Sequence, residues 1–387
     1  MQMPENTHLE LVTADAERVS TQSAQNPPDI ERLRVHAAEL ARGLAWLPGT
    51  HSSEVLYDRS HALKPQLQKI FRAVSDVSPT DVSDDFHWLH DNVHLISTEL
   101  HATAAELGEY EKVPHVRNRS FDVVPRVLAI AEGYLAAVDY EFTEASYIEY
   151  VQAFQKTTIL NLAELDALVP AMKLVLLEQI SSRGSRVVKD HKSTHGTGVC
   201  VGSLRDISQN NWREVVDRLL AFESVLKGDP AGAYARMDRD SRVVYRKQVS
   251  HFAEHSDFTE MEVAAAALAL AREAQRQIYA DRRVGVRRSH IGYYLIAEGA
   301  PALRRKVRYR APFGQRVKIF LRSHPDEFYL PSIELLTLFI ILGILLPLIG
   351  PGTSLTRMLL SVFILLLPCS QAAVQIVNYI VTAVLRP

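Results

Sequence analysis

The chain has 387 residues, of which 47% are hydrophobic and 23% are charged, and its formal net charge is −2. These values lie close to globular averages and exclude a collagen, a disordered tail and a disulfide-stapled miniprotein. They also average two different compositions, because residues 1–330 are polar and patterned whereas residues 331–385 are almost entirely apolar. The two cysteines, Cys200 and Cys369, are predicted to be free thiols in a reducing compartment.

The charge is divided as unevenly as the hydropathy. The segment Arg282–Arg322 holds twelve Lys and Arg residues against one acid, Glu298, so it carries +11 and the rest of the chain carries −13. A basic block beside an apolar block is typical of a protein at a membrane surface rather than of a nucleic-acid-binding protein. We therefore expect the lipid bilayer as a partner and no nucleic acid.

Helical periodicity dominates the chain after its first thirty residues. Residues 1–30 are polar and lack the apolar region of a signal peptide, so we predict a disordered N-terminus without a cleaved leader. A cytoplasmic all-α domain is predicted for residues 31–325, with a short strand pair near Val187–Leu204 as the exception considered. Its expected helices are Ile30–Leu47, Asp84–Leu107, one after Asp122, Ser146–Phe154, Leu160–Ile180 with a kink or break at Pro170, Asn211–Leu226, Arg242–Ala253 and Met261–Tyr279.

Two transmembrane helices are predicted at the apolar end, which gives a mainly α fold class. Residues 331–350 contain one charge, Glu334, and twenty helical residues span about 30 Å, the thickness of a bilayer core. Residues 358–385 contain no formal charge. Eight Lys and Arg residues precede the first helix and only Arg357 lies between the two, so the positive-inside rule places residues 1–330 in the cytoplasm. The second apolar segment contains three amide side chains, Gln371, Gln375 and Asn378. Their spacing places them on one helix face, which would suit contact with another membrane helix.

Histidines at helical spacing are the first candidates for chemistry. His87, His90 and His94 share one face of the predicted helix, and two imidazoles four residues apart can bind zinc. No HExxH motif and no third ligand accompany them, so we expect packing side chains rather than a metal site. The glycine-rich His195–Gly202 matches no phosphate-binding loop and is predicted to be a flexible loop.

Carboxylates give no convincing active site either. Asp238 and Asp240 form a D-x-D pair of the kind that holds a divalent ion in nucleotide-sugar transferases, but the flanks are helical and a cap near Ser241 explains the pair better. The predicted helix Leu160–Ile180 also carries three acids, Glu164, Asp166 and Glu178. Acids on a helix are by themselves a weak sign of acid–base catalysis. We therefore predict no catalytic residue and no cofactor in this chain.

Five segments in order carry a resemblance to a known family. They resemble the N-terminal region of bacterial cyclic β-1,2-glucan synthase from about residue 80 onward, although Asp166 stands where that pattern has Trp, Lys173 where it has Arg, and Arg239 where it has an aromatic residue. The segments are FHWLHDNVHLI (Phe86–Ile96), PRVLAIA (Pro125–Ala131), YVQAFQ with NLAELDALVPAMKLVLLE (Tyr150–Glu178), DPAGAYARMDRDSRVVYR (Asp229–Arg246) and HIGYYLI (His290–Ile296).

The resemblance implies a bacterial inner-membrane protein. Members of this family polymerise glucose from UDP-glucose into β-1,2-linked chains, using transferase and phosphorylase modules that would follow the apolar helices. The chain then corresponds to the membrane-anchored N-terminal portion, lacks those modules, contacts the downstream transferase module of the same enzyme, and is not catalytic alone. The alternatives are a non-catalytic membrane scaffold or regulatory protein, and a metal-binding membrane enzyme that uses the histidines.

Two roles remain open for the segment Asp229–Arg246. In the first, Asp229 caps a turn at Pro230, and Arg242 and Arg246 pair with acids on a neighbouring helix. In the second, Tyr234, Tyr245 and Arg246 bind a glucan primer, because aromatic rings stack on sugars and guanidinium groups bond hydroxyls.

Overall fold

Side-chain caps fix where several helices of the computed structural model begin. Asn161 and Glu164 form a capping box at the start of the longest helix of the domain, and Thr259 and Glu262 form another. Asp29 caps the first described helix through the amides of Glu31 and Arg32. The structure describes residues 29–52, 54–77, 82–110, 112–118, 120–192, 194–312, 316, 325–348 and 354–385. Of the N-terminus predicted to be disordered, residues 1–30, the first 28 lie outside this range, whereas Asp29 caps the first described helix and Ile30 is its first residue.

The chain divides into two compact units. The first, called the helical domain below, comprises Met1–Ala253 and Phe258–Leu303; the second comprises Glu254–Asp257 and Arg304–Pro387 and contains an apolar helical hairpin. The helices up to the middle of the domain are α2 (Ile30–Gly43), α3 (Glu54–Ser75), α4 (Asp84–Asp91), α5 (Val93–Gly108), α6 (Arg126–Ala137), α7 (Glu144–Gln155), α8 (Leu162–Lys189) and α9 (Thr197–Gln209). The following ones are α10 (Trp212–Leu219), α11 (Glu223–Lys227), η1 (Tyr234–Arg236), α12 (Arg239–Glu254), α13 (Glu260–Arg276), α14 (Arg282–Arg288), α15 (Ile291–Leu295) and α16 (Ala300–Lys306).

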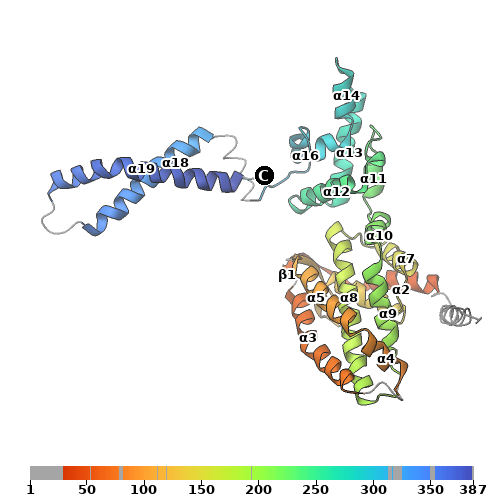
Figure 1. The fold of residues 1–387 in the computed structure, drawn as a ribbon. Coiled ribbons are helices and arrows are strands. Elements are labelled where there is room, and N and C mark those ends of the chain that lie inside the picture. Colours follow the sequence, from red (N-terminus) through yellow and green to blue (C-terminus); the bar gives the residue numbers. More distant parts are fainter. Residues whose placement is uncertain are drawn as a thin grey trace, which may run out of the picture. The chain divides into compact units, whose positions relative to one another are not determined.

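Helix α8 is the centre of the first half of the domain. It contacts α3, α5, α6 and α9, and Figure 1 shows α3, α5 and α9 beside it. Its leucines at positions 168, 174, 176 and 177 are fully buried, as expected for a helix that is enclosed on several faces. Next to it, the buried rings of Tyr134, Tyr147 and Tyr150 pack at tilted or edge-to-face angles with centroids 5.4 Å apart. The mainly helical fold predicted from the sequence is confirmed.

A three-stranded antiparallel sheet corrects the all-α prediction. The strands β1 (Ala45–Ser52), β2 (Lys112–Arg117) and β3 (Val123–Pro125) pair in the order β1-β2-β3. The predicted helix Ile30–Leu47 therefore ends at Gly43, because the segment that follows is extended and pairs with a strand more than sixty residues away. The register of β1 against β2 shifts between Trp46 and Thr50, around Pro48-Gly49, which in the sequence signals only a turn. The strand pair considered near Val187–Leu204 is wrong, since α8 and α9 occupy that region.

Other helix boundaries also differ from the prediction. Asp84–Leu107 is two helices, because Asn92 has φ −114° and ψ 16°, and its side-chain Nδ2 donates to the carbonyl of Trp88 at 2.8 Å. The predicted helix Asn211–Leu226 is likewise two helices, α10 and α11. The predicted loop His195–Gly202 contains the first turns of α9, which begins after Gly196 in the left-handed region at φ 70°. In α8 the helix runs through Pro170 without ending and continues to Lys189.

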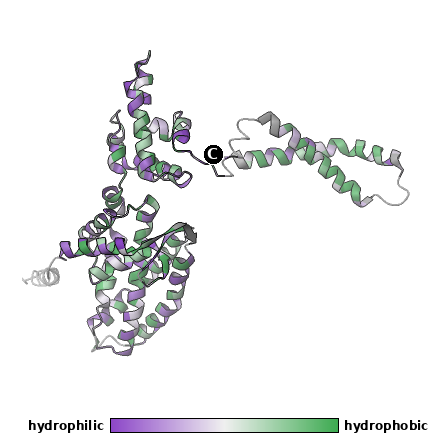
Figure 2. Ribbon diagram, turned by 180° about the vertical axis from the view of Figure 1, so that it is seen from behind, coloured by the Kyte–Doolittle hydropathy of each residue, from purple (hydrophilic) through white to green (hydrophobic). Residues whose placement is uncertain are grey.

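The hairpin of the second unit consists of α18 (Pro325–Leu345), the short η2 (Leu346–Leu348) and α19 (Leu355–Leu385). Figure 2 shows both long helices as mostly hydrophobic. The helices pack on each other through Ile341, Leu345 and Cys369, and Tyr329 donates its hydroxyl to Asn378 at 2.8 Å. Thr356–Ala383 is long and apolar enough to cross a membrane, whereas the apolar part of α18, Tyr329–Leu345, is shorter than that criterion. The predicted residues 349 and 350 of the first apolar helix lie outside the described range.

Both cysteines are free, as predicted. Cys200 lies in α9 rather than in a loop, and burial raises the pKa of its thiol to about 11.

Candidate functional site

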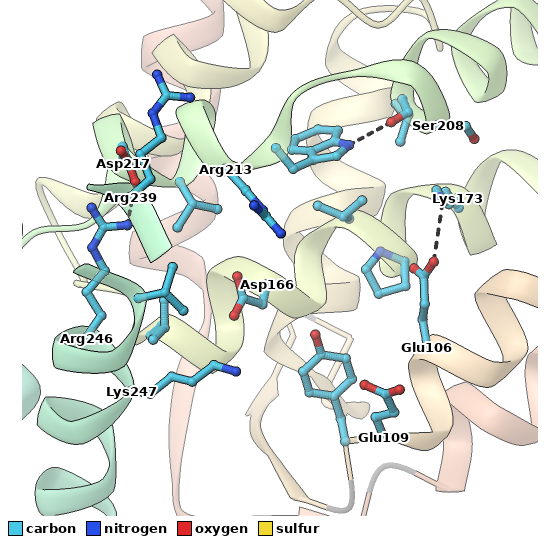
Figure 3. Close-up of a pocket in the computed structure, with 18 residues that line it drawn as sticks. Glu106, Glu109, Asp166, Lys173, Ser208, Arg213, Asp217, Arg239, Arg246 and Lys247 are labelled. Atoms are coloured by element: carbon cyan, nitrogen blue, oxygen red, sulfur yellow. Dashed lines mark hydrogen bonds and ion pairs between the residues drawn. The ribbon is translucent and has the colours of Figure 1, made fainter. Parts of the chain in front are cut away.

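A pocket of about 510 Å³ opens in the helical domain between α5, α8, α10 and α12 (Figure 3). Such concave sites, with apolar walls and a few converging polar groups, are where small molecules bind in most proteins. Its lining residues are Glu106, Glu109, Tyr110, Leu162, Asp166, Val169, Pro170, Lys173, Ile207, Ser208, Trp212, Arg213, Val216, Asp217, Arg239, Val243, Arg246 and Lys247.

Trp212 gives the pocket a fixed aromatic wall. Its indole Nε1 donates to the carbonyl of Ile207 at 2.7 Å, and its ring meets Tyr147 edge-to-face with the centroids 5.4 Å apart. The ring is thus held by a hydrogen bond on one side and by the aromatic cluster of the domain on another. Because these two partners lie on α9 and α7, Trp212 of α10 is positioned by tertiary packing.

Most of the charged groups around the pocket are neutralised by neighbours. The lining holds five cationic side chains and four acids. Lys173 lies 3.0 Å from Glu99, Arg239 lies 2.6 Å from Glu214, and Arg246 pairs with Asp217. Among the residues that the structure describes, Asp166 and Lys247 have no such ion pair, and Figure 3 shows them on facing helices, α8 and α12. Glu109, which also lines the pocket, has no ion pair among the described residues either. The pocket therefore offers two unpaired carboxylates and one unpaired ammonium group without imposing a strong net charge.

The carboxyl group of Asp166 titrates close to neutral pH. Burial raises its pKa to about 6, and the positive charges of Lys247 and Arg246 oppose this shift. Burial also raises the pKa of Tyr110, with a further contribution from the charge of Asp166. Asp217 is committed to its ion pair with Arg246, which leaves Asp166 and Glu109 as the lining carboxylates without an ion pair among the described residues.

The three residues predicted as glucan-primer ligands lie mostly inside the domain. Tyr234 is fully buried and donates its hydroxyl to Glu223 at 2.9 Å. Arg246 donates through Nε to the same carboxylate at 2.9 Å, and Tyr245 shares a hydrogen bond of 3.0 Å with His290. Of the three, only Arg246 reaches the pocket. These internal partners favour the structural role that was the first of the two alternatives, although primer binding itself stays a prediction.

Asp229 connects three segments of the domain. Its Oδ2 accepts from the amides of Ala233 and Tyr234 at 3.0 and 3.2 Å and from His290 Nδ1 at 2.8 Å, while Oδ1 accepts from the amide of Ile291 at 2.9 Å. Burial alone would raise the pKa of this carboxyl, but the donated hydrogen bonds outweigh burial and lower it. The predicted turn cap is present, and the contacts with residues 290 and 291 add a tertiary role.

The histidines and the D-x-D pair are also placed by the structure. The break at Asn92 puts His87 and His90 in α4 and His94 in α5, so they do not share one helix face. Within the described ranges their ring nitrogens do not converge as a set of three ligands, and the prediction about metal stays untested. Asp238 accepts from the amide of Ser241 at 2.8 Å and from its hydroxyl at 2.7 Å, which is the capping role expected for the pair.

Sequence reasoning missed the pocket itself. Asp166 was noted as one of several helix acids and as a departure from the glucan synthase pattern, and Tyr110, Trp212 and Lys247 were not singled out. The available signal was position: Asp166 lies four residues after Leu162 and three before Val169, so these side chains are neighbours on one face of α8.

Comparison with known proteins supports a distant relationship. No protein family profile matches the chain. The chain is similar to the cyclic β-(1,2)-glucan synthase NdvB of Rhizobium meliloti (strain 1021), with 22% identity over an alignment of 454 residues. The alignment covers 92% of this chain but only 16% of that protein, so the chain spans about a sixth of the relative's length. The similarity supports a distant relation to the cyclic β-1,2-glucan synthases and, through it, a related function.

Proposed function

We propose that this chain is a membrane-anchored helical module of a β-glucan-synthesising system, and that its pocket holds a segment of the saccharide. The observation that carries the proposal is the pocket of Figure 3, with its fixed Trp212, its free Asp166 and its nearly balanced charge. The similarity to a cyclic β-(1,2)-glucan synthase supplies the saccharide class. The alternative is a scaffold or regulatory protein whose pocket binds no ligand.

An uncharged, hydroxyl-rich ring suits this lining better than a nucleotide does. The apolar hydrogens on one face of a pyranose can lie against the Trp212 ring, while hydroxyl groups donate to Asp166 and accept from Lys247. A nucleoside diphosphate would instead require a local excess of positive charge or a divalent ion held by hard oxygen ligands. In this pocket the cations are largely paired with acids. The module therefore holds a polymer segment and leaves sugar transfer to another part of the system.

The membrane anchor of the proposal is the hairpin of α18 and α19. The segment Thr356–Ala383 meets the length and hydropathy expected of a membrane helix. Helix α18 has 21 residues, about 32 Å at 1.5 Å per residue, and we propose that it crosses the bilayer as the partner of α19. The basic residues that precede it orient the helical domain toward the cytoplasm, in the inner membrane of a bacterium.

Saccharide binding is tested by titrating the full chain, reconstituted in nanodiscs, with a β-1,2-linked glucotetraose in a calorimeter. We expect binding that weakens about tenfold or more, roughly 1.4 kcal/mol, in Asp166→Asn and in Trp212→Ala. Asp58→Asn, an exposed acid of α3 outside the pocket, is the matched control and should bind as the parent does. Absence of binding by a folded parent protein, or equal loss in the control, would reject the pocket and favour the scaffold.

Two further assays test the anchor and the division of labour. A reporter that is active only in the periplasm should be active when fused at Thr353, between the two apolar helices, and silent at the C-terminus. The reverse pattern would contradict the proposed topology. Purified chain should not incorporate glucose from UDP-glucose, and β-1,2-glucan made by this chain alone would reveal an active site that the proposal lacks.

A further inference from the structure

An arginine-rich tip lies at one extremity of the helical domain, where α14 follows α13 (Figure 1). This basic tip comprises residues 278–288 and has two components. Four arginines, all exposed, lie within the seven residues of α14. Three aliphatic side chains between or just before them are also exposed: Ile278, which is fully open to solvent, Val284 and Val286.

Specific side-chain contacts hold the basic tip in its conformation. Asp281 caps α14 by accepting from the amide of Arg283 at 2.8 Å. Tyr279 folds back under the helix, where Gly285 leaves room for it: a Cβ at that glycine would come within 3.1 Å of the ring. The guanidinium of Arg288 lies over the same ring, 5.4 Å from its centroid. The positions of the exposed side chains are therefore set by tertiary contacts.

Two of the four arginines lack an internal partner. Arg287 lies 2.8 Å from Glu298, and Arg288 stacks on Tyr279. Arg282 and Arg283 form no ion pair within the part of the chain that the structure describes. Uncompensated cations next to exposed aliphatic groups match a surface that is anionic outside and apolar a few ångströms below, which describes a bilayer with acidic headgroups.

We propose that the basic tip docks onto an anionic lipid surface, with Ile278 and the two valines entering the headgroup region and Arg282 and Arg283 bonding lipid phosphates. Single exposed aliphatic residues are common on proteins, but three within nine residues, framed by arginines, are not. The membrane-length helix Thr356–Ala383 belongs to the same chain and makes a bilayer the available surface. The inference goes beyond saccharide binding and shares only the membrane anchor with it.

The test places an environment-sensitive NBD probe at the tip of the full chain. Cys200 and Cys369 are replaced by Ala, Ile278→Cys is labelled, and the protein is reconstituted in nanodiscs of phosphatidylcholine with and without phosphatidylglycerol. We expect a blue shift and at least a twofold rise in emission only in the anionic nanodiscs, reversed by about 0.5 M salt because screening weakens such contacts. Ile159→Cys, an equally aliphatic exposed position between α7 and α8, is the matched control and should not respond.

A second variant separates charge from hydrophobicity. Arg282→Gln with Arg283→Gln should abolish the response at position 278 while leaving the melting temperature unchanged, because neither side chain forms an ion pair with another described residue. No response at position 278 in protein that stays in the nanodisc overturns the inference and leaves the anchor intact. An equal response at positions 159 and 278, or a response that needs an added acidic protein instead of acidic lipid, also overturns it.

Discussion

Helix α8 of the domain and helix α19 of the hairpin are both long and rich in aliphatic residues, and each contains an internal proline. Their surroundings differ. Helix α8 is buried by protein on most of its faces, and Leu174 and Leu176 are fully buried. Of the described residues of α19, only Cys369, Ala373 and Val377 are buried. Large apolar side chains such as Phe363 and Leu367 are 77% exposed.

The difference shows what each helix requires of its environment. Helix α8 carries charges within its sequence, and the domain supplies partners for them: Arg126 for Glu164, and Arg59 for Glu178. The apolar window of α19 carries almost no charge, and only 17% of it is buried, against α18. Since large exposed apolar surfaces are unfavourable in water, α19 needs an apolar solvent or further protein. The domain's helices, by contrast, depend on polar contacts that water and pH can disturb.

Breaking the buried ion pair at the start of α8 should cause the largest loss of folding stability. Arg126 donates to Glu164 through Nε at 2.6 Å and through Nη2, and the two side chains are 5% and 1% exposed. Arg126→Ala should lower the free energy of unfolding by about 3–5 kcal/mol, because the carboxylate is left buried without a partner. Thermal denaturation followed by circular dichroism at 222 nm measures it.

The control for this prediction is an exposed pair. Arg213→Ala removes a contact of 3.4 Å to Asp240 between side chains that are 75% and 85% exposed, so its effect should stay below about 1 kcal/mol. Equal effects of the two variants would mean that burial does not govern the pairs of this domain. The double variant Arg126→Met with Glu164→Leu should recover most of the loss, apart from the capping contact to Asn161.

A charge in the middle of α19 should have the next largest effect. Leu367 lies near the centre of Thr356–Ala383, where an arginine costs about 2.5–3.5 kcal/mol of insertion free energy, or roughly a hundredfold. Leu367→Arg should therefore shift the chain from the carbonate-resistant membrane fraction to the soluble or aggregated fraction, while Leu367→Ile should not. An unchanged membrane fraction in Leu367→Arg would remove the contrast between the two helices.

Local pattern predicted the elements whose stability is local. The capped, periodic helices α7, α12 and α13 were found within a few residues, as was the cap at Asp238. The sheet was missed because β1 contains Pro48-Gly49 and because its pairing with β2 is a long-range contact without a local signature. The helix break at Asn92 was missed for a similar reason, since the sequence there stays amphipathic on both sides.

The candidate site was predictable only in part, because it exists only after folding. Tyr234, Tyr245 and Arg246 were left with two possible roles, and their partners Glu223 and His290 come from other segments of the chain. The pocket brings together residues that lie more than a hundred positions apart, such as Tyr110 and Lys247. No spacing rule along the chain connects such residues.

Removing the charge of Asp229 should cause a smaller loss of folding stability, and this loss should depend on pH. Its pKa is lowered in the folded state, so its contribution to stability is complete above the unfolded value near 3.9 and is lost as the pH falls through the folded value. Asp229→Asn should cost about 1–3 kcal/mol at pH 7, because an amide cannot accept all four donors. Melting curves from pH 7 to pH 2 should be flatter below pH 4 in the variant than in the parent.

Replacing Asp166 should have the smallest effect on folding stability. Unlike the other substitutions, it should stabilise the protein near neutral pH. Burial raises its pKa to about 6, so between pH 4 and pH 6 the folded state binds more protons than the unfolded state, and acidification through this range favours folding. Asp166→Asn should remove this slope and slightly raise the melting temperature at pH 8, where the parent carries the charge. The same substitution weakens saccharide binding in our proposal, so a variant that is more stable but binds less marks Asp166 as a ligand-binding group. A variant that melts lower at pH 8 would show instead that the carboxylate supports the fold, in the way that Glu164 does two residues earlier on the same helix.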